Sequence, residues 1–286
     1  MSTVVSTRVS GEAEMRIVGI SGQMGSGKDT VAAHLVEHHD YLQMALADPI
    51  KRLGKYVFAF TNEQLWGPSE CRNAVDDRYT LCEIRSSNTK FGPGLTTKGL
   101  AKVCDGGWLI AAKALLEYGP EWLEEVLPDR DVNEEMKILC KAFASLGHKY
   151  PELSPRVMLQ YFGTEWGRDR EHGIWVKCLF RNATKVLKGH GYRRDVGVGG
   201  LSYGSGVIVS DIRFKDELEA FKDVGGKLIR IHRKETDEDA AKIGISCHPS
   251  EQEQKEFKDD MFDVIIQNNG SLKELLKNVD DIAVVL

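Results

Sequence analysis

One stretch near the beginning of the chain reads Ile17-Val18-Gly19-Ile20-Ser21-Gly22-Gln23-Met24-Gly25-Ser26-Gly27-Lys28-Asp29-Thr30. A short apolar run leads into a glycine-rich turn, and after Lys28 the apolar residues recur at helical spacing. The pattern therefore predicts a strand, a loop and a helix. The glycines let backbone N–H groups approach phosphate oxygens without Cβ clashes, and the helix N-terminus adds a partial positive charge. We expect a phosphate-binding loop in which Lys28 reaches the β- and γ-phosphates of a nucleotide.

The loop departs from the common GxxxxGK[ST] pattern at one position. Asp29 stands where a hydroxyl group normally holds magnesium, and Thr30 follows one residue later. The same offset occurs in the pattern GxxGxGKGT of nucleoside monophosphate kinases, so the loop resembles small-molecule kinases more than GTPase switches. A glycine turn that binds nothing is the alternative, which the complete motif disfavours. From this loop the residues expected to bind ATP are Gly22, Gly25, Ser26, Gly27, Lys28, Asp29 and Thr30.

Composition excludes several classes of protein. The 286 residues are 42% hydrophobic and 28% charged, their net charge is −5, and the pI is near 6.0. This balance argues against a stable nucleic-acid partner, and no apolar run is long enough to cross a membrane. The six cysteines form no CxxC pair, and residues 1–14 hold no apolar signal segment, so we interpret them as a disordered tail. These features favour reduced thiols in a cytoplasm, that of a host if the protein is viral.

Six stretches together resemble the deoxynucleoside monophosphate kinases of tailed bacteriophages. They are Ser26–Thr30, Ala47–Lys51, Ser154–Arg168, Trp175–Lys177, Val209–Arg213 and Asn268–Leu272. The alternation of predicted strands and helices, with the phosphate loop at the first strand–helix turn, predicts an α/β fold of the three-layer α/β/α P-loop kinase type, with a parallel sheet, over residues 15–286. No motif matches about 62–150, but apolar residues recur at uneven helical spacing in 108–127, and we interpret this region as a helical insertion that binds the acceptor. The resemblance implies a lid over about 232–260. ATP and Mg²⁺ would be the cofactors and a deoxynucleoside 5′-monophosphate (dNMP) the substrate.

Asp48 and Lys51 are candidates for substrate binding. Asp48 follows a predicted strand at Tyr41–Leu46, and the carboxyl end of such a strand is where a ligand meets a parallel sheet. The simpler interpretation is helix capping, with Asp48 as N-cap and Pro49 at the first helical position.

A second helix begins at Ser154, with Pro155 in its first turn. Polar residues recur along it at a spacing of four and are expected to share one face. The resemblance places this helix along the acceptor pocket, although a solvated polar face is the alternative. Its candidate substrate-binding residues are Arg156, Gln160, Thr164, Glu165 and Arg168.

The later strands supply the remaining candidates. Asp211 ends the predicted strand Val207–Ser210, where a carboxylate can orient the waters of a magnesium ion, so Asp29, Thr30 and Asp211 form the expected metal site. Capping of the following helix is the alternative for Asp211. The resemblance assigns Arg213 to the acceptor phosphate and Arg233 to the lid. Arg233 begins a charged segment, for which a solvated surface is the alternative interpretation.

The last loop of the resemblance comprises Asn268, Asn269 and Gly270. In similar kinases this turn, between the last strand and the helix from Leu272, lies against the adenine of ATP. We therefore include the three residues among those expected to bind ATP.

One further pattern, His34-Leu35-Val36-Glu37-His38, matches the HxxEH zinc motif. It lies on the helix that leaves the phosphate loop, and no further glutamate ligand is evident. The sequence therefore disfavours a metal site here and favours an exposed helix end.

The predicted function is phosphoryl transfer from ATP to a dNMP. Lys28 would hold the donor phosphates, and Arg156, Arg213 and Arg233 would neutralise charge on the acceptor and the transferring group. Two alternatives remain open: a small-metabolite kinase of the same fold, such as a dephospho-coenzyme A or phosphomevalonate kinase, and an ATP-binding module without turnover. A homodimer is compatible with the sequence, which does not determine the oligomeric state.

Overall fold

The computed structural model describes residues 16–23, 25–79, 106–150, 152–171, 173–188, 192–193, 197–198, 206–234, 253–254, 256–283 and 286. The chain divides into two compact units. We call residues 1–44 and 182–286 the sheet unit and residues 45–181 the helical unit. The expected tail, and most of the expected lid, lie outside the described residues.

The sheet unit is built on five parallel strands in the order β2-β5-β1-β6-β7. Their bounds are β1 Arg16–Ser21, β2 Tyr41–Met44, β5 Gly206–Val209, β6 Lys227–His232 and β7 Val264–Gln267. β1 lies in the centre between β5 and β6, and its residues Ile17 to Ile20 are buried. Burial on both faces explains why the central strands read as continuous apolar runs.

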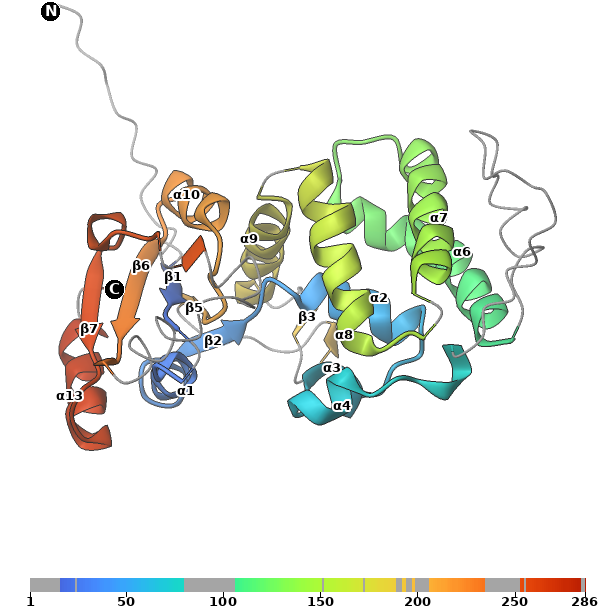
Figure 1. The fold of residues 1–286 in the computed structure, drawn as a ribbon. Coiled ribbons are helices and arrows are strands. Elements are labelled where there is room, and N and C mark those ends of the chain that lie inside the picture. The colour runs from blue at the N-terminus through green and yellow to red at the C-terminus, as the bar shows by residue number, and fades with distance from the viewer. Residues whose placement is uncertain are drawn as a thin grey trace, which may run out of the picture. The chain divides into compact units, whose positions relative to one another are not determined.

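Helices cover both faces of this sheet (Figure 1). On one face, α1 (Lys28–His38) and α13 (Leu272–Ala283) bury Leu35 and Val279 against Ile20 and Ile229 of the sheet. On the other face, Phe221 of α10 (Lys215–Asp223) packs so closely on β1 that a Cβ at Gly19 would lie 3.0 Å from its ring. The three-layer α/β/α arrangement with a parallel sheet is therefore confirmed.

Parallel strands bring their following loops to one edge of the sheet. The phosphate loop follows β1, Asp211 follows β5, Arg233 follows β6 and Asn268 follows β7. Chain topology alone therefore gathers four of the predicted site segments at this edge.

The helical unit begins at α2 (Asp48–Tyr56) and ends within α9 (Ile174–Leu187). Between them lie α3 Asn62–Trp66, α4 Ser69–Asn73, the 3₁₀ turn η1 Asp77–Tyr79, α6 Gly106–Val126, α7 Val132–Lys149, α8 Pro155–Gln160 and the π-helix η2 Tyr161–Arg168. The short segments outside this unit are the antiparallel pair β3 Tyr192–Arg193 and β4 Gly197–Val198, and η3 Asp259–Met261.

Buried aromatic rings form the core of the helical unit. Phe58 stacks on Phe143 with ring centroids 5.5 Å apart, and Trp108 meets Phe143 edge-on at 5.3 Å. The indole of Trp122 donates to the carbonyl oxygen of Pro49 at 2.8 Å, which ties α6 to α2. These packed rings give this unit a core separate from that of the sheet unit.

Two local predictions differ from the structure. Asp48 is the first residue of α2 rather than its N-cap, which is Ala47. The Asp48 side chain instead accepts a hydrogen bond from the backbone N–H of Ala45 at 2.9 Å, because the chain turns before the helix. The helix from Ser154 forms, with Ser154 as N-cap, but changes to π-winding after Gln160.

No helix in the part of the chain that the structure describes is long and apolar enough to span a bilayer.

Candidate phosphate-binding site

The phosphate loop owes its shape to close backbone approaches. A Cβ at Gly22 would lie 2.5 Å from Oγ of Ser26 and 2.8 Å from the carbonyl oxygen of Ile231. Gly27 has φ +100°, and a Cβ there would lie 2.6 Å from Nδ2 of Asn268. Larger residues at either position would push the loop away from β6 or β7, so glycine is required at both.

Lys28 opens α1 and lies among charged groups. The pKa of Lys28 is lowered overall, mainly because burial disfavours the charged ammonium. The carboxylate of Asp29 opposes this shift, the guanidinium of Arg213 adds to it, and the carboxylate of Asp211 opposes it. The ammonium donates a weak hydrogen bond to the carbonyl oxygen of Gln23 at 3.4 Å. Burial and a neighbouring arginine both destabilise the charged ammonium of Lys28. An anionic ligand such as a phosphate would therefore stabilise it strongly.

Asp29 is held by a short chain of polar side chains. Gln43 of β2 donates from Nε2 to Oγ of Ser210 at 3.3 Å, and Ser210 donates to Oδ1 of Asp29 at 3.1 Å. Ser210 ends the strand segment before Asp211 and is buried. The chain orients the Asp29 carboxylate at the first turn of α1, while Asp29 and Thr30 remain exposed.

Arg213 is positioned through the backbone that carries it. Oε2 of Glu217 accepts the N–H groups of Arg213 at 2.7 Å and of Phe214 at 3.0 Å. Burial raises the pKa of Glu217 to about 8, against the effect of these two N–H groups. The Arg213 side chain itself is exposed and sufficiently near Lys28 to affect its pKa.

Two further predicted residues contact the loop from β6 and β7. Arg233 approaches the carbonyl oxygen of Gly25 with NH1 at 3.5 Å, and Asn268 donates from Nδ2 to the carbonyl oxygen of Ser26 at 2.8 Å. Asn269 accepts the backbone N–H of Lys234 at 2.8 Å. The structure therefore brings Asn268 and Arg233 to the phosphate loop, while Gly270 lies at the exposed start of α13.

The residues predicted for the acceptor lie in the helical unit. Asp48 is buried and also faces the indole Nε1 of Trp66, 3.4 Å from Oδ1, and Nζ of Lys51 lies 5.6 Å from the centroid of the Trp66 ring. Glu165 is engaged by Nζ of Lys149 at 2.6 Å and by the hydroxyl of Tyr150 at 3.1 Å.

The polar residues of α8 and η2 are largely exposed, although the helix changes from α to π between them. Arg156, Gln160 and Thr164 are exposed and Arg168 is half-buried. Trp175 donates from Nε1 to the carbonyl oxygen of Gly163 at 2.8 Å, which supports the π-helical segment from α9. Gly167 allows the ring of Trp175 to pack against the helix backbone. π-Helical segments are rare and frequently occur at functional sites.

The chemistry of the sheet edge suits a hard divalent cation. Asp29, Thr30 and Asp211 offer carboxylate and hydroxyl oxygens, the ligands that Mg²⁺ prefers, and both carboxylates lie near the Lys28 ammonium. These residues fit the predicted magnesium site.

Sequence reasoning missed Ser210, Gln43 and Glu217. Glu217 stands three residues after Phe214, as the glutamate of a capping box would, but Phe214 has no side-chain oxygen to complete that pattern, so the sequence carried only half of the signal. Ser210 and Gln43 carry no motif, because their role depends on strands that pair only in the folded sheet.

No protein-family model matches the chain. The chain is similar to a protein of Acanthamoeba polyphaga mimivirus named "Putative deoxynucleotide monophosphate kinase". The two are 24% identical over 268 residues, which cover 93% of this chain and 94% of the viral protein. The similarity thus extends over both units, including the 62–150 region that no motif matched.

Proposed function

We propose that this protein is a kinase that transfers the γ-phosphoryl group of ATP to a deoxynucleoside 5′-monophosphate. The observation that carries the proposal is the gathering of Lys28, Asp29, Asp211 and Arg213 beside a glycine loop at the carboxyl edge of the sheet. The full-length similarity to a viral protein named as such a kinase supports the same reaction.

The donor nucleotide would be bound by the sheet unit. Backbone N–H groups of the phosphate loop and the ammonium of Lys28 would hold its phosphates, and the turn at Asn268 would lie beside its base. Asp29, Thr30 and Asp211 would hold Mg²⁺, which supplies neutralisation of phosphate charge when bound.

The acceptor would be bound by the helical unit, with Arg156 and Arg168 facing its phosphate and Asp48, Lys51, Gln160, Thr164 and Glu165 around the nucleoside. An acceptor phosphate is already ionised at neutral pH, so the reaction needs no strong general base. Positioning and charge neutralisation by Arg213 and Arg233 would carry catalysis.

A coupled assay of ATP consumption tests the proposal. Each dNMP and NMP is offered in turn, followed by dephospho-coenzyme A, phosphomevalonate and DNA. Stimulation by dNMPs supports the proposal. Stimulation only by another metabolite, only by DNA, or by nothing would overturn it in favour of a metabolite kinase or an ATP-binding module.

A further inference from the structure

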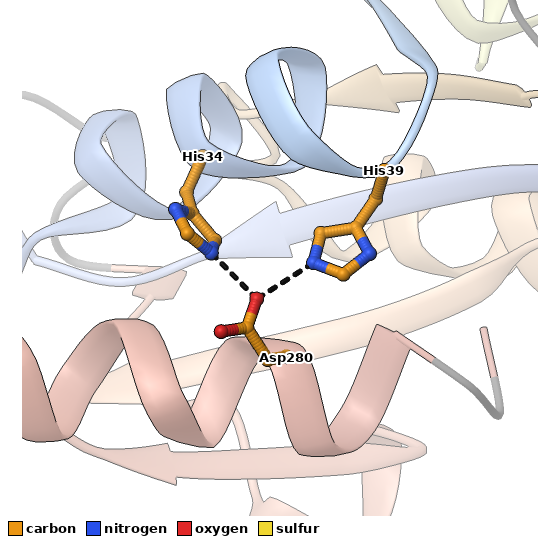
Figure 2. A group of neighbouring side chains, drawn as sticks. All are labelled: His34, His39 and Asp280. Carbon is orange, nitrogen blue, oxygen red and sulfur yellow. Dashed lines mark hydrogen bonds and ion pairs between the residues drawn. The ribbon is translucent and has the colours of Figure 1, made fainter.

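A cluster of three metal-binding side chains lies away from the phosphate loop, at the far end of α1. Nε2 of His34 and Nε2 of His39 each lie 2.7 Å from the same oxygen, Oδ1 of Asp280 (Figure 2). The two histidines come from the end of α1 and Asp280 comes from α13, 241 residues or more along the chain. Two imidazoles and a carboxylate are a common ligand set for zinc.

The pairing differs from the HxxEH pattern seen in the sequence. His38, the second histidine of that pattern, is exposed and lies 3.8 Å from Oε2 of Glu37. His39 takes part instead, because α1 ends there and the backbone N–H of His39 still bonds to the carbonyl oxygen of Leu35. The partner of the two histidines is thus a distant aspartate that no local motif contains.

Packing fixes the helices that carry the three ligands. His34 neighbours Leu35, Asp280 neighbours Val279, and both apolar residues are fully buried in the core shared by α1 and α13. The His34 side chain is only 11% exposed, whereas that of Asp280 is 52% exposed. The cluster is therefore held from the core side and open to ions from solvent.

The distances suit a metal after a small adjustment. All three ligand atoms lie within 4.8 Å of one another. Around a tetrahedral zinc ion with bonds of about 2.0–2.1 Å, ligand atoms lie about 3.3 Å apart. Side-chain rotation would have to open the two nitrogen–oxygen contacts of 2.7 Å to about 3.3 Å. It would also have to bring the two ring nitrogens, which lie within 4.8 Å of each other, to about the same separation, with water as the fourth ligand.

We propose that His34, His39 and Asp280 form a binding site for a zinc ion, which joins the C-terminal end of α1 to α13. Both helices start at nucleotide-site loops, since α1 follows the phosphate loop and α13 follows the turn at Asn268. The bound ion would join the two helices near their C-terminal ends, whereas the nucleotide-site loops precede their N-terminal ends. The site does not depend on the proposed kinase reaction.

Binding of Co²⁺, the spectroscopic substitute for zinc, tests the site in the full chain after removal of any affinity tag and of adventitious metal. Titrations are done with excess Mg²⁺, which occupies oxygen-ligand sites. The expected result is an intense visible absorption band at one equivalent, which Zn²⁺ abolishes, and a rise in the melting temperature with Zn²⁺.

His39→Gln and Asp280→Asn should each lower Zn²⁺ affinity by more than the ~10–100-fold typical of losing a supporting contact. His38→Gln is the matched control, because the His38 ring packs against His34 with centroids 4.5 Å apart but is not one of the three proposed ligands, and it should retain the band. Far-UV circular dichroism confirms that each variant is folded. A wild-type protein without the band, or equal loss in His38→Gln and His39→Gln, would overturn the proposal.

Discussion

The phosphate loop and the polar face of α8 and η2 both offer groups suited to phosphate, but they are held in different ways. Lys28 and its neighbours are fixed by backbone contacts and by the ends of paired strands. Arg156, Gln160 and Thr164 are exposed side chains on one helical segment. A site made from backbone geometry is set before a ligand arrives, whereas exposed side chains must be ordered when the ligand binds. We therefore expect substitutions in the first region to affect chemistry and those in the second to affect binding.

Lys28→Ala should have the largest effect. In the proposed reaction the ammonium would face the developing charge of the transferring group, so its loss should lower the rate by on the order of 10³ or more. Steady-state turnover with ATP and dNMP measures this. Lys215→Ala, on the exposed side of α10, is the matched control. A folded Lys28→Ala protein within tenfold of wild type would remove the basis for the donor site.

Arg156→Lys and Arg213→Lys test whether an arginine of each unit binds the acceptor phosphate, which for Arg213 would be an exception to the rule that the sheet-unit site acts on chemistry. Lysine keeps the charge but loses the paired geometry with which arginine binds a phosphate, so dNMP affinity should fall by about tenfold while ATP affinity stays near normal. Separate calorimetric titrations of ATP and dNMP give both affinities, with Arg72→Lys in α4 as the control. Loss of ATP affinity with retention of dNMP affinity would place that arginine on the donor side.

Asp29→Asn tests whether the phosphate loop of the sheet unit also binds the metal ion. If the carboxylate holds magnesium, the variant should need several-fold more Mg²⁺ for half-maximal activity, with a smaller change in KM for the dNMP. Asp223→Asn, at the end of α10, serves as control. An unchanged magnesium titration would leave Asp29 as a favourable charge at the N-terminus of α1.

Glu217→Gln should have the smallest effect on activity and a clear effect on pH dependence. The folded-state pKa of about 8 lies above the value of an unfolded glutamate, so the stabilising contribution is complete at low pH and is lost as the pH rises through about 8. Chemical denaturation at pH 5 and pH 8.5 should show a larger loss of unfolding free energy in wild type than in Glu217→Gln. Glu219→Gln, exposed on the same helix, should behave as wild type. If the unfolding free energy changed equally with pH in all three proteins, the raised pKa could not belong to Glu217.

The sequence was most informative where local pattern decides structure. The glycine loop, the strand ending before Asp211 and the turn after β7 follow from short apolar runs and breaks, and the structure contains each of them. It was less informative where structure depends on tertiary contacts. π-Winding after Gln160 leaves no periodic trace, and the buried position of Asp48 depends on Trp66 in another helix. The contact of Asp280 with His34 could not be predicted, because helix packing creates it.

The most direct test of the central claim is to identify the product. Wild-type protein is incubated with ATP, Mg²⁺ and each dNMP, and the nucleotides are separated by anion-exchange chromatography. We predict that a deoxynucleoside diphosphate and ADP form in equal amounts with at least one dNMP, and that Lys28→Ala forms neither. ATP loss without a deoxynucleoside diphosphate, or no reaction of a folded protein with any dNMP, would contradict the account.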